Sequence, residues 1–129
     1  MSRCVVDASA VLAWLFQERG ASAVDKVLGT SALSAVNLGE VLYRCDEVGM
    51  ATYAIARDLE AIGVSIEPFG ADDAHLVEEV RRVARHHAVR LSLADCCCLA
   101  TGIRLDLPVV GGDDAWRGLK LGIEVHPIR

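Results

Sequence analysis

The chain has 129 residues, 53% hydrophobic and 24% charged, with a formal net charge of −5. This composition excludes a disordered chain, and the acidic balance argues against a protein that coats nucleic acid regardless of its sequence. No apolar run reaches the roughly 18 residues that span a bilayer, and the start of the chain leaves no room for a signal peptide. We therefore expect one domain over residues 1–129, in the cytoplasm and away from membranes.

Hydrophobic patterns predict strands and helices in alternation. The predicted strands cover residues 3–6, 30–33, 64–67, 109–110 and 123–126. The predicted helices cover residues 8–16, 21–28, 35–48, 55–62, 71–87 and 93–105. Short strands separated mainly by helices indicate a parallel sheet covered on both faces. In such open sheets, ligands bind beyond the carboxyl ends of the strands.

Several details of the helices follow from single residues. Ser34 and Ser92 are expected to cap the helices that follow them, and glycines are expected to end the earlier ones. Val41, Cys45 and Val48 form one apolar stripe, and Ile55, Leu59 and Ile62 form another. The five cysteines, at positions 4, 45, 96, 97 and 98, are odd in number and lack zinc spacing, so we expect reduced, buried thiols.

Acidic residues stand where this architecture places chemistry. Asp7 directly follows the first strand, and Asp113 and Asp114 follow the fourth strand after two glycines. Asp95 and Glu40 lie in segments that are otherwise almost free of charge. Carboxylates that converge on one crevice repel each other, and a divalent cation such as Mg²⁺ or Mn²⁺ removes that penalty. Such an ion can activate water and neutralise charge on a phosphodiester.

Each acid also has an ordinary structural explanation. Asp7 could cap the first helix, and Asp95 could complete a capping box that begins at Ser92. Glu40 could pair with Arg44 one turn along a solvated stripe. The two aspartates after the glycines could be plain turn residues.

Five blocks carry a family resemblance that runs over nearly the whole chain. They are residues 5–14, 34–42 and 91–95, Trp116, and residues 121–125. In their joint order they resemble the PIN-domain family, in particular the VapC-type toxins of bacterial toxin–antitoxin pairs. The resemblance implies a three-layer α/β/α fold around about five strands in the order 3-2-1-4-5. It also implies endonucleolytic cleavage of RNA with Mg²⁺ or Mn²⁺, inhibition by an antitoxin whose tail occupies the acidic cleft, and a homodimer.

The resemblance carries over to particular acids. Asp7, Glu40 and Asp95 match the core acids of the family, Asp113 matches the fourth, and Ser9 matches a hydroxyl residue that supports the first. It implies that Asp7 and Asp95 are the main metal ligands, with Glu40 binding directly or through water. Asp113 would help to hold a second ion or orient the attacking water.

The chain departs from the family at three positions. Gly111 replaces a usual Thr or Ser, Asp114 replaces a frequent Arg, and Cys96 replaces a common basic residue. Asp114 is therefore a supporting candidate that could substitute for Asp113, and Asn37, next to Glu40 on its helix, is another supporting candidate.

The densest basic stretch covers residues 81–90. A solvated helix face is the simplest explanation, but Arg85, His86 or Arg90 could contact RNA phosphates near the acids. Trp14 and Trp116 could stack on bases, although packing is the more ordinary role.

Two other functions stay open. The departures at residues 111 and 114 favour a non-catalytic PIN-like module that only binds RNA or protein. A phosphatase or phospho-acceptor domain is disfavoured because Asp7-Ala8-Ser9 lacks the second acid of an Asp-x-Asp motif, and neither Lys26 nor Lys120 follows a strand.

Overall fold

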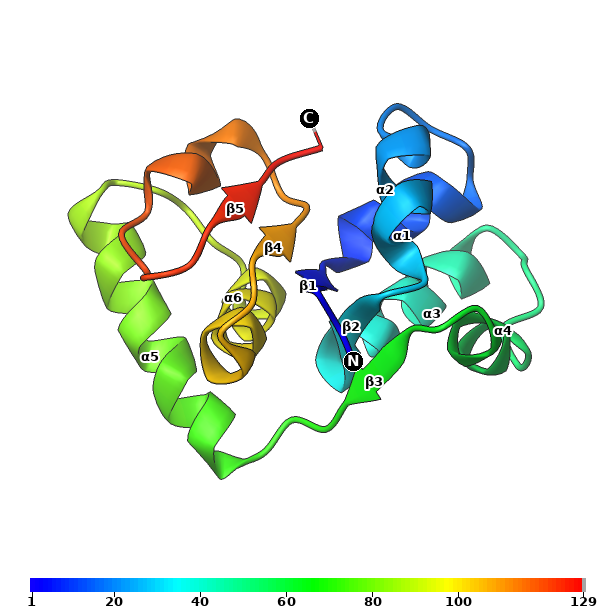
Figure 1. The fold of residues 1–129 in the computed structure, drawn as a ribbon, viewed down its shortest axis with the longest axis horizontal. Coiled ribbons are helices and arrows are strands. Elements are labelled where there is room, and N and C mark those ends of the chain that lie inside the picture. The colour runs from blue at the N-terminus through cyan, green and yellow to red at the C-terminus, as the bar shows by residue number, and fades with distance from the viewer. Residues whose placement is uncertain (129) are drawn as a thin grey trace.

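A five-stranded parallel sheet forms the centre of the protein (Figure 1), and the computed structural model describes residues 1–128. Its strands are β1 (Cys4–Val6), β2 (Ser31–Ser34), β3 (Ser65–Glu67), β4 (Val109–Val110) and β5 (Val125–His126). They lie in the order β3-β2-β1-β4-β5, and each neighbouring pair is parallel. The predicted strand order is thus confirmed. The order reverses between β1 and β4, where such sheets form a crevice.

Within residues 1–128, six α-helices and one 3-10 helix surround the sheet. They are α1 (Ala8–Leu15), α2 (Ala21–Leu28), α3 (Ala35–Glu47), α4 (Ile55–Ala61), α5 (Ala71–His86), α6 (Leu93–Leu105) and the 3-10 helix η1 (Asp114–Gly118). Figure 1 shows α5 and α6 on one side of the molecule and α1 to α4 on the other. Each of these α-helices lies within one residue of its predicted bounds at either end, whereas η1 was not predicted. Within residues 1–128, no helix has both the length and the apolar character needed to cross a membrane.

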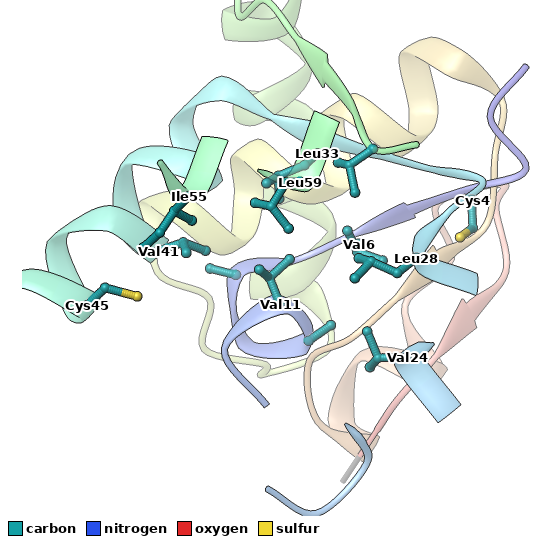
Figure 2. Close-up of a cluster of buried hydrophobic side chains, with 13 residues drawn as sticks. Cys4, Val6, Val11, Val24, Leu28, Leu33, Val41, Cys45, Ile55 and Leu59 are labelled. Carbon is teal, nitrogen blue, oxygen red and sulfur yellow. The ribbon is translucent and has the colours of Figure 1, made fainter. Parts of the chain in front are cut away.

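The sheet separates two hydrophobic cores. Alternate residues of β1 point to opposite faces: Cys4 and Val6 belong to one core and Val5 to the other. The first core, drawn in Figure 2, joins β1 and β2 to α1, α2, α3 and α4. The second joins the opposite face to α5, α6 and η1, and includes the fully buried Leu99. Packing on both faces holds the strand ends in fixed positions.

For two residues the predicted burial is wrong. Val48 is 65% exposed because it lies just beyond the end of α3, and Ile62 is 44% exposed for the same reason beyond α4. Both helices stop before the apolar pattern does, so the final apolar residue turns toward solvent.

The cysteines match their prediction. All five are free and buried, and burial raises the pKa of every one of these thiols. They therefore act as small hydrophobic residues, and all but Cys97 belong to one of the two cores.

Candidate active site

A cleft of about 430 Å³ opens at the edge of the sheet where β1 and β4 end. Its lining includes the four acids that the sequence singled out, Asp7, Glu40, Asp95 and Asp113. Asp7 follows β1, Glu40 lies on α3, Asp95 lies on α6, and Asp113 follows β4. The fold thus brings together acids that are spread over most of the chain.

Asp7 is the most deeply buried of these acids and is only 5% exposed. It caps α1, since its Oδ1 accepts the Ala10 N–H at 2.8 Å, and the Ser9 hydroxyl donates to Oδ1 and Oδ2 at 2.8 and 2.9 Å. Burial raises the pKa of Asp7. Donors on Ala10, Ser9 and Gly112 lower this pKa, and the charge of Asp95 raises it. Burial dominates, so the ionised form of Asp7 is disfavoured without a nearby cation.

Asp95 belongs to a complete capping box at the start of α6. Its Oδ2 accepts the Ser92 N–H at 2.9 Å, and its own N–H donates to the Ser92 hydroxyl at 3.0 Å. The structural and the functional explanation of Asp95 are therefore compatible, because one carboxylate both caps the helix and lines the cleft. The same holds for Asp7 at the start of α1. Both acids stand at the positive end of a helix dipole, which favours negative charge there.

Glu40 lies in the second turn of α3 and is connected to α6 through Asn37. The Asn37 amide donates to the backbone oxygen of Ala94 at 3.1 Å and contacts Glu40 Oε1 at 3.5 Å. Asn37 is 1% exposed, and its Oδ1 has no hydrogen-bond partner among residues 1–128. The ion pair that the sequence suggested between Glu40 and Arg44 is not among those formed within residues 1–128, and both side chains line the cleft.

Asp113 and Asp114 differ in position although they are adjacent. Asp113 lines the cleft and caps η1, where its Oδ1 accepts the Ala115 N–H at 2.9 Å. Asp114 is not part of the lining, and it lies 3.4 Å from Arg117 in an exposed ion pair. Geometry therefore favours Asp113 over Asp114 as the fourth acid of the cleft.

The arginines and tryptophans that the sequence suggested for RNA binding also differ in whether they line the cleft. Arg90 lines the cleft, whereas Arg85 is an exposed residue of α5 outside it. Trp116 reaches the cleft but is 3% exposed and belongs to the second core, so its role is packing. Trp14 packs against the first core and donates its indole N–H to Asp25 at 2.9 Å.

Part of the cleft wall was not predicted from the sequence. Glu18, Glu47 and Arg44 also line it, from the segment after α1 and from α3. The sequence suggested only a pairing with Glu40 for Arg44, and no role for the two glutamates. No local pattern signals that these side chains meet across a cleft.

The cleft has the chemistry of a site for a hard cation. Mg²⁺ and Mn²⁺ prefer carboxylate oxygens, and Mg²⁺ keeps several waters while binding one or two carboxylates directly. Among the described residues, no group of three His, Cys, Asp or Glu side chains is close enough to hold an ion by itself. The carboxylates of the cleft nevertheless offer the oxygen donors that these ions prefer. A bound cation would stabilise Asp7 most among these acids. Asp7 is buried, and it takes part in none of the ion pairs formed within residues 1–128.

Comparison with known proteins identifies the class. The model of the PIN domain matches residues 4–120, so the chain belongs to the PIN domain family. A search of curated proteins gives no match.

Solved structures share the fold. A toxin–antitoxin complex from Klebsiella pneumoniae is 17% identical with a TM-score of 0.76, over 98% of each chain. DNA-bound VapBC from Salmonella typhimurium is 11% identical with a TM-score of 0.77, over 100% of each chain. VapC20 from Mycobacterium tuberculosis, described as a toxin that cleaves the sarcin–ricin loop, is 17% identical with a TM-score of 0.67, over 94% of this chain and 98% of its own.

Proposed function

We propose that the protein is a cytoplasmic, Mg²⁺- or Mn²⁺-dependent endoribonuclease that acts as the toxin of a toxin–antitoxin pair. Membership of the PIN domain family and the fold shared with toxin–antitoxin proteins support this proposal. The observation that carries it is the convergence of Asp7, Glu40, Asp95 and Asp113 on one cleft. A cleft lined by acids suits metal-assisted hydrolysis of a phosphodiester.

We expect the four acids to have different roles in metal binding, according to their positions in the cleft. Asp7 and Asp95 would be the main metal ligands, with Glu40 binding directly or through water. Asp113 would help to hold a second ion or orient the attacking water. The bound cation would lower the pKa of a water and neutralise charge on the phosphate. The hydrogen bonds from Ser9 and Ala10 hold the Asp7 carboxylate in one orientation, so it needs little rearrangement when the cation arrives.

The arginines of the cleft supply contacts to the substrate. Arg44 and Arg90 line the same cleft as the acids and offer planar donors that match phosphate oxygens. We expect them to bind phosphates next to the one that is cleaved. Arg85 lies outside the cleft, so we expect it to contact phosphates only when the bound RNA is long enough to extend beyond the cleft. RNA as the substrate is also supported by VapC20, which cleaves the sarcin–ricin loop.

The antitoxin is the expected protein partner. The neighbours from Klebsiella pneumoniae and Salmonella typhimurium are toxin–antitoxin assemblies. The cleft carries six acids, which are the four above with Glu18 and Glu47, against two arginines. A basic tail would complement that charge. A homodimer also belongs to this proposal, and sedimentation of the purified chain tests it.

Cleavage of total cellular RNA by the purified chain tests the activity. We expect cut products with Mg²⁺ or Mn²⁺, none with chelator, and none from the Asp7→Asn variant. Asp46→Asn is the matched control, because Asp46 is an exposed acid of α3 outside the cleft. Cleavage that persists in chelator or in Asp7→Asn would contradict the proposal.

A non-catalytic binding module is the second candidate. It is favoured by the lack of a ready-made group of three metal-binding side chains among residues 1–128. If this candidate is correct, the wild-type chain retains RNA in a gel-shift assay with Mn²⁺ present but leaves it uncut.

A further inference from the structure

The loop after β4 passes directly over the Asp7 carboxylate. Gly111 and Gly112 form this loop, and both are buried with positive φ angles of 140° and 72°. A Cβ atom added to Gly111 would lie 2.9 Å from Asp7 Oδ2 and closer still to Oδ1 and Cγ. Real Cβ atoms essentially never approach that closely, so either the loop or the carboxylate would have to move.

The loop has little freedom to move. The Gly111 N–H donates to the backbone oxygen of His126 at 3.1 Å, which ties the loop to β5. On the other side, the Asp7 N–H donates to the backbone oxygen of Val110 at 3.3 Å, which ties β4 to the end of β1. A displaced loop would break sheet hydrogen bonds, so the Asp7 side chain is the part that would yield.

The next glycine, Gly112, lies beside the same carboxylate. Its backbone N–H lowers the pKa of Asp7, as the donors of Ser9 and Ala10 do. Its own missing Cβ leaves room for the Trp116 ring, because a Cβ there would lie 2.5 Å from two ring carbons. The two glycines therefore let one backbone segment fit between the carboxylate and the ring.

We propose that Gly111 is a positioning residue for Asp7: its lack of a side chain lets the β4 loop close on the carboxylate and hold it at the metal-binding edge of the cleft. The donors of Ser9 and Ala10 fix Asp7 from the start of α1, and the glycine loop fixes it from β4. With the loop in this conformation, a side chain at position 111 turns the carboxylate away and leaves the sheet intact. The effect on RNA cleavage rests on the proposed function, whereas the contact with Asp7 does not.

A double-mutant cycle between Gly111→Ala and Asp7→Ala tests the contact without using metal or RNA. Alanine at φ 140° is strained in both backgrounds, so that strain cancels in the cycle and the contact with the carboxylate remains. We expect Gly111→Ala to lower the melting temperature by about 4 °C or more in the wild-type chain and by clearly less in Asp7→Ala. Gly122→Ala is the matched control, because Gly122 has φ 77° but open space around its Cβ position. Its effect should be the same in both backgrounds.

Each outcome decides the proposal. An equal loss of melting temperature in the two backgrounds would overturn it. If Gly111→Ala alone fails to fold, a folded Gly111→Ala/Asp7→Ala double variant supports the proposal, and two unfolded variants overturn it. In the RNA assay, Gly111→Ala should cut at least about tenfold more slowly, and Gly122→Ala should cut as fast as wild type. Coupling in the cycle with no cleavage by the wild-type chain would support the positioning of Asp7 and contradict the nuclease.

Discussion

Asp73 and Asp7 are both buried aspartates at the start of a helix, and they differ in what balances their charge. Asp73, at the start of α5, is 2% exposed, accepts the Gly70 N–H at 2.8 Å, and meets the Arg104 Nε at 2.6 Å. Arg104 also reaches Glu67 at 3.2 Å. Asp7 at the start of α1 is 5% exposed and accepts hydrogen bonds, but it is absent from the ion pairs formed within residues 1–128.

This difference separates an acid whose charge is balanced by an arginine from one that has no such partner within residues 1–128. A buried carboxylate with its own arginine has its charge balanced inside the protein. A buried carboxylate without one carries an unbalanced charge that a bound cation can neutralise. The same burial therefore has opposite consequences in the two places, which leads to four expectations.

The largest expected effect is on cleavage. Under the proposed function, Asp7→Asn should slow RNA cleavage by about a thousandfold, because it removes the buried charge that would bind the cation. Asp73→Asn should leave the rate within about threefold, since Asp73 lies outside the cleft. Cleavage rates on one fluorescent RNA with Mn²⁺ measure both. Equal losses of cleavage rate in the two variants would contradict the different roles assigned to Asp7 and Asp73.

The second effect is on stability. Arg104→Leu should lower the free energy of unfolding by roughly 2 kcal/mol, because Asp73 then stays buried without its cation. Arg82→Leu breaks an exposed pair with Glu78 and should cost less than about 0.5 kcal/mol. Urea unfolding of both variants gives the comparison, and a loss at Arg82 as large as that at Arg104 would contradict it.

The third effect concerns the exposed end of the site. Asp113→Asn should slow cleavage by about tenfold, less than Asp7→Asn, because an exposed acid is more easily replaced by water. Asp114→Asn should change the rate by less than about twofold, since Asp114 faces Arg117 outside the cleft. Single-turnover rates distinguish them. The reverse order would make Asp114 the fourth acid.

The smallest effect is a pH dependence. Burial raises the pKa of Asp7 above its ordinary value of 3.8, so the folded chain binds this proton more tightly than the unfolded chain does. The stability from Asp7 is thus present below pH 3.8 and lost as the pH rises through the raised pKa. In chelator, wild type should lose stability relative to Asp7→Asn over that range, and excess Mn²⁺ should oppose the loss. A stability difference that is constant with pH, with or without metal, would contradict this.

Local patterns predicted most of the fold, for physical reasons that particular residues make clear. Ser34 and Ser92 cap α3 and α6 as expected, because a hydroxyl at that position satisfies a free backbone N–H. The strands appear where short apolar runs occur, and the acids that follow β1 and β4 reach one cleft because the strands are parallel.

What the sequence did not show depends on contacts between distant residues. Arg104 meets partners 31 and 37 residues away, and no spacing rule connects them. The conformation of Gly111 and Gly112 was also hidden, because glycine accepts many backbone angles and only the packed Asp7 and Trp116 select these. The strand order and the ranking of the acids came from family resemblance rather than from periodicity.

The pairing of β1 with β4 has a consequence for when the site matures. Asp7 is made early, but Gly112 and Asp113, which complete its surroundings, come near the end of the chain. Ribosomes add about 5–20 residues per second, so roughly 5–20 seconds separate the two. During that time β1 lacks one of its two neighbours in the sheet. The acidic cleft is therefore incomplete until residues 112 and 113 have been made and β4 has paired with β1.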